Sequence, residues 1–324
     1  MALLEVKNLH TYFKTRKGIV KAVNDVSYSL DSGKTIGIVG ESGSGKSVSA
    51  MSILQLLDGN GYIAEGEVIF EGKDLTKLSQ QEMYSIRGNK ISVIFQEPMT
   101  SLNPVFTIKR QLSEPFIIHQ KMSKKEAEKK AVEMLYAVQI PNPETVLLQY
   151  PHQLSGGMRQ RVMIAMALSC NPRILIADEP TTALDVTIQA QILRLMTDLK
   201  EKLGTAIILI THDMGVVAEM ADNVLVMYAG QAIEYAAVAD IFASPKHPYT
   251  QGLLKSIPKL HEDVDRLYAI KGSVPSAVNF PKGCRFAPRC EKCRPLCMEK
   301  APELYELGDG RKVRCHLYAG RDGN

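Results

Sequence analysis

A glycine-rich segment that ends in a lysine and a serine is the first stretch of the sequence suited to chemistry. It runs from Gly40 to Ser47, reads GESGSGKS, and fits the pattern GxxxxGK[ST]. In this pattern, backbone N–H groups close around phosphate oxygens, the lysine adds a mobile positive charge, and the last hydroxyl can bind Mg²⁺. The residues expected to bind phosphate are Gly40, Ser42, Gly43, Ser44, Gly45, Lys46 and Ser47. The alternative is a glycine-rich turn that matches by chance, and the strand expected before it and the helix expected after it weigh against that.

Two adjacent carboxylates follow an apolar run at residues 174–177, namely Asp178 and Glu179. Ligands gather at strand ends of open α/β sheets, so this position suits a nucleotide site. We expect Asp178 to hold a metal ion directly or through water. Glu179 would accept a proton from the water that attacks a γ-phosphate. A solvated acidic turn is the alternative, and it is the weaker one beside the glycine loop.

A second anion site is indicated by Leu154-Ser-Gly-Gly-Met158, which precedes a helical segment at 159–169. Ser155 is expected to cap that helix, and Gly156 and Gly157 leave the amides of its first turn uncovered. One chain seldom needs two anion-binding segments to bind one triphosphate. A second subunit would therefore supply the other half of each nucleotide site, whereas the alternative is a simple helix cap.

Five of the six cysteines fall between Cys284 and Cys315, and Cys170 is alone in the main body of the chain. In a protein of the reducing cytoplasm, such density favours metal ligation over disulfides. Zinc and iron–sulfur clusters both use four thiolates, so one of the five would be spare. The residue pattern alone leaves open which one.

Short apolar runs of strand type must position these groups, and helical stretches separate most of them. They are residues 35–39, 174–177, 206–210 and 224–228. This alternation predicts an α/β fold with a mainly parallel sheet, while residues 3–7 and 67–70 predict an antiparallel flank. Helical periodicity prevails over about 97–170, with a capping box expected from Ser123 to Glu126. From about residue 244 the composition changes, with many prolines, basic residues and cysteines. This change divides the chain into a main domain, 1–243, and a C-terminal region, 244–324.

Composition and charge exclude several classes of protein. The 324 residues are 45% hydrophobic and 23% charged, which excludes a disordered or collagenous chain. No apolar run approaches the roughly 18 residues that a spanning helix needs. The net charge of +4 is too small to act as a nucleic-acid footprint, so we expect no nucleic-acid partner. Because residues 1–10 carry charges where a secretory signal would be apolar, we expect a cytoplasmic protein.

Over about residues 1–240, the sequence resembles the nucleotide-binding domain of ABC ATPases. The resemblance rests on motifs that occur in one order: 40–47, Gln96, 154–158, 178–179, 183–185 and 211–212. It implies that ATP is bound and hydrolysed, with Mg²⁺ held by Ser47, Gln96 and Asp178. It further implies that Glu179 is the catalytic base, that Gln96 contacts the lytic water, and that His212 steadies the γ-phosphate and Glu179. Ser155 and Gly157 would close over the partner's ATP, and Asp185 would lie at the dimer seam.

The resemblance also implies an aromatic residue that stacks on adenine. Phe13 lies where the family usually carries it, five residues after Asn8, and the adjacent Tyr12 is the alternative. Stacking adds affinity with little discrimination between bases, so weak acceptance of GTP is expected.

Two further stretches, 95–104 and 247–258, are similar to ATP-binding subunits of bacterial dipeptide and oligopeptide importers. Nickel importers share the pattern. The resemblance implies that ATP hydrolysis powers peptide import and that the chain pairs with a second, related ATPase as a heterodimer. Two transmembrane permease subunits and an extracytoplasmic peptide-binding protein would complete the transporter, with this chain at the cytoplasmic side of the membrane. The loop from Pro98 to Asn103 would contact a membrane subunit, so changes there should uncouple transport and spare nucleotide binding.

In these importers the usual cysteines match Cys284, Cys290, Cys297 and Cys315, while Cys293 departs from the common pattern. The resemblance therefore implies a [4Fe–4S] cluster on those four thiolates. Zn²⁺ is the alternative metal, and unligated thiols are the remaining possibility.

Three other functions would use the same nucleotide-binding domain. A nickel or other small-solute importer would keep the ATPase role and change the cargo. A DNA-maintenance ATPase would need a long coiled-coil insertion, and the section between Gln96 and Leu154 is too short for one. A translation-associated factor would carry two nucleotide-binding domains in tandem. The sequence has one glycine loop, which argues against that function.

Overall fold

The fold is taken from a computed structural model, which describes residues 2–96, 101–182, 184–257 and 268–320. The chain divides into two compact units. The first comprises residues 1–30, 35–76 and 211–324, and the second comprises residues 31–34 and 77–210. The C-terminal region thus lies in the same unit as the glycine loop.

The first unit contains an antiparallel sheet near the N-terminus. Its strands stand in the order β2-β1-β4-β5, with bounds β1 Leu4–Thr15, β2 Gly18–Leu30, β4 Gly61–Phe70 and β5 Lys73–Asp74. Leu4 pairs with Phe70 and Val6 with Val68, and all four side chains are buried. The predicted antiparallel flank is confirmed, and its strands are longer than the apolar runs indicated.

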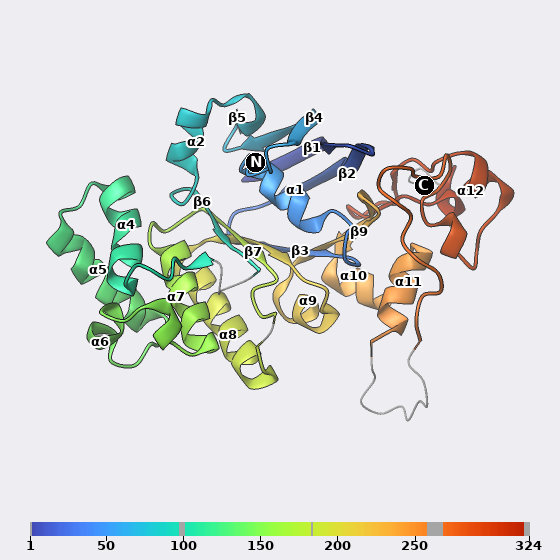
Figure 1. Cartoon of the computed structure of the whole chain (residues 1–324). Helices are drawn as coiled ribbons and strands as arrows, with labels where there is room; N and C mark the ends of the chain where they lie inside the picture. The colour runs from blue at the N-terminus through green and yellow to red at the C-terminus, as the bar shows by residue number, and fades with distance from the viewer. Residues whose placement is uncertain (1, 97–100, 183, 258–267, 321–324) are drawn as a thin grey trace. The chain divides into compact units, whose positions relative to one another are not determined.

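Strands of the first unit also include the one that leads into the glycine loop. In the order β11-β12-β10-β9-β3, their bounds are β11 Tyr305–Glu306, β12 Lys312–Val313, β10 Gln231–Ala237, β9 Asn223–Tyr228 and β3 Thr35–Val39. β3 and β9 are parallel, whereas β9 and β10 are antiparallel. Where the structure describes this unit, its α-helices are α1 Lys46–Ile53, α9 Met214–Met220, α10 Val238–Ala243, α11 Pro248–Lys255 and α12 Pro295–Glu299 (Figure 1).

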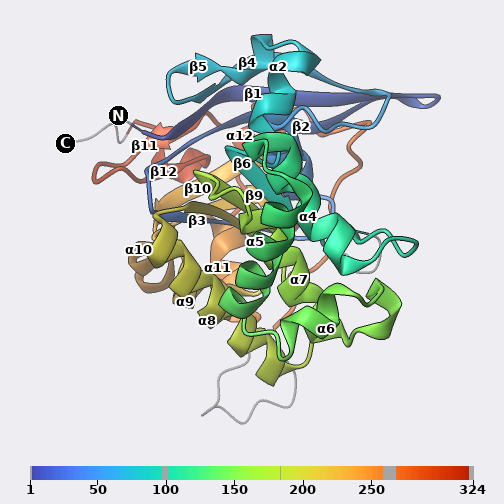
Figure 2. The same cartoon turned by 90° about the vertical axis from the view of Figure 1, so that its left-hand side faces the viewer.

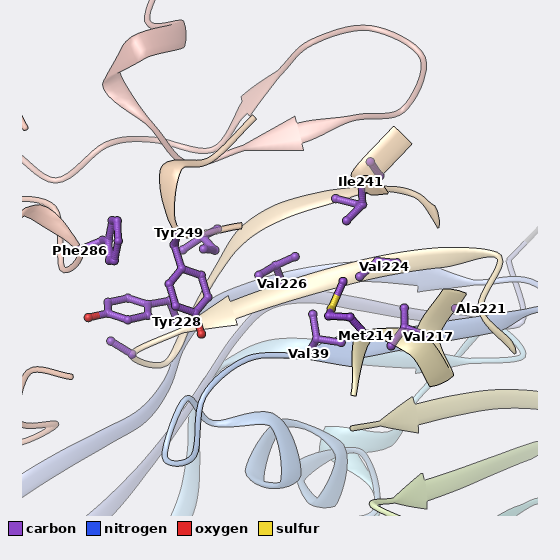
Figure 3. Packing of buried hydrophobic residues seen from close by; sticks show 13 residues of the cluster. Val39, Met214, Val217, Ala221, Val224, Val226, Tyr228, Ile241, Tyr249 and Phe286 are labelled. Atoms are coloured by element: carbon purple, nitrogen blue, oxygen red, sulfur yellow. The ribbon is translucent and has the colours of Figure 1, made fainter. Parts of the chain in front are cut away.

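An aromatic cluster joins the C-terminal region to strand β9. The ring centroids of Tyr228 and Tyr249 lie 4.8 Å apart, and Phe286 meets Tyr228 edge to face at 5.2 Å. Figure 3 shows these rings continuing the aliphatic core that Val226 and Val39 begin. Because buried aromatic rings contribute large apolar areas, this cluster fixes α11 and the segment around residue 286 against β9.

The second unit combines a parallel sheet with a group of helices. Strands β6 Ile91–Ile94, β7 Ile174–Asp178 and β8 Ala206–Ile210 are parallel neighbours. Among the described residues of this unit, the α-helices are α2 Gln80–Ile86, α4 Ile108–Gln120, α5 Lys124–Ala137, α6 Pro143–Leu147, α7 Gly156–Leu168 and α8 Val186–Leu203. Both views show α4, α5, α6 and α7 as one group (Figure 1 and Figure 2). The predicted parallel core and helical section are confirmed in this unit.

Helix α5 begins where the sequence predicted. The Ser123 N–H donates to the Glu126 carboxylate at 2.9 Å, and the Glu126 N–H donates to the Ser123 hydroxyl, so the capping box is present. The helix buries Ala127, Ala131 and Leu135, which form an apolar stripe along one face. In the part of the chain that the structure describes, none of the helices is long and apolar enough to cross a membrane.

Candidate active site

The glycine loop has the strand–loop–helix context that its motif requires. It follows β3, and α1 begins at Lys46 with Gly45 as its N-cap. A Cβ at Gly40 would lie 2.2 Å from the Met227 carbonyl oxygen, and one at Gly45 would lie 2.3 Å from the Ala22 carbonyl oxygen. Both glycines have positive φ, so a side chain would be strained as well as obstructed. The predicted loop is therefore formed, with glycine required at both positions.

Polar groups inside this loop suit an anion. The Lys46 ammonium donates to the carbonyl oxygens of Gly40 at 2.8 Å and Glu41 at 3.1 Å, and the residue is 6% exposed. The buried hydroxyl of Ser44 has no hydrogen-bond partner among the described residues. A buried hydroxyl without a partner is costly, and a phosphate oxygen would accept its proton. The loop therefore fits the phosphates of a nucleotide.

His212 lies beside this loop in the first unit. The Thr211 N–H donates to the Ile38 carbonyl at 3.2 Å, which places the following residue near the end of β3. His212 is exposed, and Asp213 after it caps α9 through the N–H groups of Gly215 and Val216. The predicted histidine thus stands at the same strand end as the phosphate loop.

The two candidate adenine-stacking residues have different surroundings. The Tyr12 hydroxyl lies 3.0 Å from His10 Nδ1 and accepts from the Asn24 amide at 3.2 Å. Its ring meets the Tyr62 ring edge to face. Phe13 instead faces Gly61, where a Cβ would lie 2.7 Å from the Phe13 ring. Thus Tyr12 is held at both its hydroxyl and its ring, whereas Phe13 contacts a glycine.

In the second unit, the structure brings Gln96 and Glu179 together. The Gln96 amide donates to the Glu179 carboxylate at 3.0 Å, and the Thr182 hydroxyl donates to the same oxygen at 2.9 Å. Glu179 has φ +47°, an uncommon backbone conformation for a non-glycine residue, directly after the buried Asp178. Strain of this kind persists where surrounding contacts enforce it, and it is frequent at functional sites.

The Ser-Gly-Gly segment forms the start of α7 as predicted. The Met158 N–H donates to the Ser155 hydroxyl at 3.3 Å, which confirms the N-cap. Ser155 and Gly156 are exposed, and a Cβ at Gly156 would meet nothing within 4 Å. A Cβ at Gly157 would lie 3.1 Å from Ile188 Cγ2. The uncovered face of this helix start is therefore at Gly156.

Two neighbouring features complete this part of the second unit. Asp185 caps α8 by accepting the Ile188 N–H at 2.9 Å, whereas Ala183 of the same motif lies outside the described residues. Gln160 donates to the Pro180 carbonyl at 2.6 Å, which ties α7 to the turn after Glu179. Sequence reasoning missed Gln160. A polar residue on the buried face of a predicted helix was the available signal.

The prediction of a [4Fe–4S] cluster on the C-terminal cysteines is wrong. Across the described ranges, no three or more His, Cys, Asp or Glu side chains are grouped so as to hold a metal. All six cysteines are free thiols. Burial raises the pKa of Cys315 to about 11 and also raises the pKa of Cys284 and Cys290. The cysteine-rich module of the predicted fold is not confirmed.

Sequence reasoning also missed a contact between the C-terminal region and the phosphate loop. Tyr249 and Arg289 both reach Glu41, the second residue of the loop. The motif allows any residue at that position, so its pattern carries no signal for this contact.

Comparison with known proteins supports the resemblance from both ends of the chain. The family model described as ABC transporter matches residues 23–182, and that described as oligopeptide/dipeptide transporter, C-terminal region, matches residues 233–297. The oligopeptide transport ATP-binding protein AppD of Bacillus subtilis is 56% identical over 98% of this chain and 97% of its own length. The dipeptide transport ATP-binding protein DppD of Haemophilus influenzae is 48% identical over 100% and 98%.

Solved structures give the same picture for the ATPase part. The ATP-binding cassette MJ0796, solved as a dimer in a post-hydrolysis state bound to ADP and Pi, is similar with a TM-score of 0.66 and 31% identity. The match covers 72% of this chain and 98% of that one. CbiO1 from Clostridium perfringens, part of the transporter complex cbiONQ, matches with a TM-score of 0.63 and 27% identity over 75% and 91%.

Proposed function

Because this chain belongs to the ABC transporter family, in the branch of oligopeptide and dipeptide transport ATP-binding proteins, we propose that it hydrolyses ATP to power peptide import. One observation carries the proposal. The similarity to peptide-transport subunits extends through the C-terminal region, which the general ABC model does not cover. The chain is an ATPase of the ABC type, and its cargo class follows from that branch.

ATP binding begins at the glycine loop. Backbone N–H groups from Gly43 to Ser47 would surround the phosphates, and Lys46 would exchange its two carbonyl partners for phosphate oxygens. The orphan hydroxyl of Ser44 would donate to the same anion. Ser47, Gln96 and Asp178 would hold Mg²⁺, which supplies charge neutralisation at the β- and γ-phosphates.

Adenine stacking is assigned to Phe13. The Tyr12 ring and hydroxyl are engaged by Tyr62, His10 and Asn24, so using Tyr12 would break those contacts. Phe13 has no polar atom in its side chain to satisfy, and the residue that it contacts, Gly61, has no side chain.

Hydrolysis is assigned to Glu179 as the general base. Its carboxylate accepts hydrogen bonds from Gln96 and Thr182, and these orient it. A carboxylate held in this way can take a proton from water as the water attacks the γ-phosphate in line. His212 would steady the γ-phosphate from the end of β3.

The second half of the site would come from another subunit. Ser155 caps α7, and Gly156 and Gly157 form its first turn; Ser155 and Gly156 are exposed. These three residues would close over an ATP bound by a related ATPase chain. Asp185 would lie at the seam. That a 31% identical cassette is solved as a dimer with ADP and Pi supports this arrangement. In the transporter we expect a heterodimer.

Two permease subunits would receive the motion of this dimer at the cytoplasmic face of the membrane. The predicted contact segment, Pro98 to Asn103, lies partly outside the described residues. Described residues on both sides of this segment have solvent-exposed apolar side chains: Phe95 is 45% exposed and Val105 is 69% exposed. Exposed apolar side chains on both flanks of one segment support a protein contact there. A separate binding protein would deliver the peptide.

Reconstitution tests the proposal. The chain is assembled with its partner ATPase, both permeases and the binding protein in lipid vesicles, and ATP hydrolysis is measured with peptides of two to six residues or with Ni²⁺. We expect peptide to stimulate hydrolysis and uptake, and Glu179→Gln to abolish both. Stimulation by Ni²⁺ and by no peptide would overturn the cargo and favour the nickel importer. Hydrolysis indifferent to the membrane subunits would overturn the transport role.

A further inference from the structure

Two residues of the C-terminal region, Tyr249 and Arg289, contact Glu41 of the phosphate loop. The Glu41 N–H donates to the Tyr249 hydroxyl at 2.9 Å, and the Glu41 carboxylate pairs with the Arg289 guanidinium at 2.9 Å. Tyr249 lies 208 residues and Arg289 248 residues along the chain from Glu41. Both the backbone and the side chain of one loop residue are thus held from the distant end of the sequence.

The Arg289 side chain is itself fixed in place. Its Nε donates to the Lys271 carbonyl at 3.0 Å, and its terminal nitrogens donate to the Ile270 carbonyl at 3.2 Å and the Tyr228 hydroxyl at 3.3 Å. The side chain is 5% exposed. An arginine with its planar group held at several points is pre-organised for its carboxylate partner. Arg289 therefore acts as a rigid support and not as a mobile surface charge.

Glu41 in turn contacts two groups of the loop that are expected to bind phosphate. Its carbonyl oxygen accepts from the Ser44 N–H at 3.1 Å and from the Lys46 ammonium at 3.1 Å. The same residue therefore connects the C-terminal region to the loop's tight turn and to the cation that meets phosphate. A shift of Glu41 would move both.

The ion pair between Glu41 and Arg289 also affects the charge of the phosphate loop. Glu41 places a carboxylate in a loop that must bind a polyanion, and like charges repel. Arg289 offsets that charge, because its guanidinium lies in direct contact with the carboxylate. Without Arg289, the loop would carry an uncompensated carboxylate.

We propose that Arg289 and Tyr249 are positioning residues for ATP: Arg289 neutralises and orients Glu41, and Tyr249 fixes the backbone of the loop. The inference rests on the proposed function, since it assumes that this loop binds ATP. It makes the C-terminal region a determinant of nucleotide affinity.

A double-mutant cycle tests the Arg289–Glu41 pair. A fluorescent ATP analogue with Mg²⁺ is titrated into the full chain as wild type, Arg289→Gln, Glu41→Gln and the double variant. Arg289→Gln should weaken binding about tenfold, whereas the double variant should return to within about threefold of wild type because the unpaired charge is gone. Arg289→Lys, which keeps the charge, should lie between. Arg294→Gln, at an exposed position in the same region, is the matched control and should bind like wild type.

Kinetics in the assembled transporter separate positioning from a general loss of structure. Arg289→Gln should raise KM for ATP and change kcat less than twofold. Tyr249→Phe keeps the buried ring and removes the acceptor of the Glu41 N–H, so it should raise KM about threefold. If Arg289→Gln does not fold, Tyr249→Phe still tests whether the C-terminal region affects ATP binding.

Several results would overturn the inference. Unchanged binding by Arg289→Gln, or a double variant as weak as Arg289→Gln, would show that the charge pair does not act on ATP. An unchanged KM in Tyr249→Phe would remove Tyr249 from the proposal. Failure of the wild type to bind ATP, with Lys46→Ala as the reference for lost binding, would instead refute the proposed function itself.

Discussion

Gln96 and Glu179, which are 83 residues apart in sequence, are joined by a hydrogen bond of 3.0 Å from the glutamine amide to the glutamate carboxylate. Each follows the end of a parallel strand, β6 and β7, so the register of those strands sets their separation. Thr182 donates to the same carboxylate oxygen at 2.9 Å. The proposed base is thus oriented by two neutral donors, which leave it able to accept a proton.

Glu179→Gln should leave ATP binding within about twofold of wild type and reduce kcat by about 10²–10⁴, the usual contribution of a general base. The amide keeps the size of the side chain and cannot take the proton. Steady-state phosphate release and nucleotide titration measure the two effects. Glu201→Gln, on the exposed face of α8, is the matched control. Normal turnover in Glu179→Gln would exclude Glu179 as the base.

Gly156→Asp should prevent ATP-dependent pairing of subunits and leave the isolated chain folded. A Cβ at Gly156 meets nothing within 4 Å, so the chain itself has room for the new side chain. An ATP held by the partner would meet both its bulk and its charge. Chromatography with light scattering, in the presence of ATP and Glu179→Gln, measures pairing. Gly59→Asp, at a glycine with similar space, is the control. Undiminished pairing would place the second anion site elsewhere.

Val105→Ser should lower transport several-fold while nucleotide affinity stays at the wild-type value. Its side chain is 69% exposed and adjoins the segment expected to contact a permease. Removing an exposed apolar side chain has little effect on the stability of the chain, but a contact that buries it would lose roughly 1 kcal/mol. Peptide uptake and ATPase stimulation are compared with those of Tyr84→Ser, a 68% exposed aromatic on α2. Equal loss of ATP binding in Val105→Ser would contradict a coupling role.

Phe13→Ala should weaken ATP binding by about tenfold, in line with roughly 1–3 kcal/mol for one base stacked on one aromatic ring. GTP binding should fall in the same proportion because stacking discriminates little between bases. Tyr12→Ala should have a smaller effect on the affinity for both nucleotides. The comparison uses titration of the two nucleotides into the full chain. A larger loss in Tyr12→Ala would reassign the stacking residue.

The buried His247 should make the free energy of unfolding depend on pH. Burial lowers the pKa of His247 to about 3, and its Nδ1 accepts the Tyr249 N–H at 3.0 Å. The folded chain therefore favours the neutral ring. Its contribution is complete above the unfolded pKa near 6.5 and is lost as pH falls toward 3, by at most about 1.4 kcal/mol per pH unit.

Denaturant unfolding at pH 7.5, 6.0 and 5.0 measures this slope. Glu234, whose pKa is raised by burial, contributes with the opposite sign, so the comparison must be made between variants. His247→Asn keeps a side-chain acceptor for the helix cap and removes the titrating ring. It should flatten the loss of stability between pH 6.5 and 5. An identical slope in both proteins would assign the acid sensitivity to other groups.

Local patterns predicted most of the strands and helices and several of the helix caps. The strand runs at 35–39 and 206–210, the capping box at Ser123 and the N-cap at Ser155 all lie where they were expected. Each depends on interactions within a few residues, which is why spacing and residue type suffice. The cysteine pattern misled for the same reason. Spacing does not say how side chains are grouped in space, and among the described residues no three or more potential ligands are grouped so as to hold a metal.

The sequence by itself determined the phosphate loop, the carboxylates at the end of β7, the helix caps and the family, because these are short-range or ordered patterns. Only the tertiary structure decided that Gln96 and Thr182 hold Glu179, and that Arg289 reaches across 248 residues to Glu41. The register of β6 and β7 makes the first contact. The packing of Tyr228, Tyr249 and Phe286 makes the second possible. Both depend on how distant segments pack together, which motif spacing does not encode.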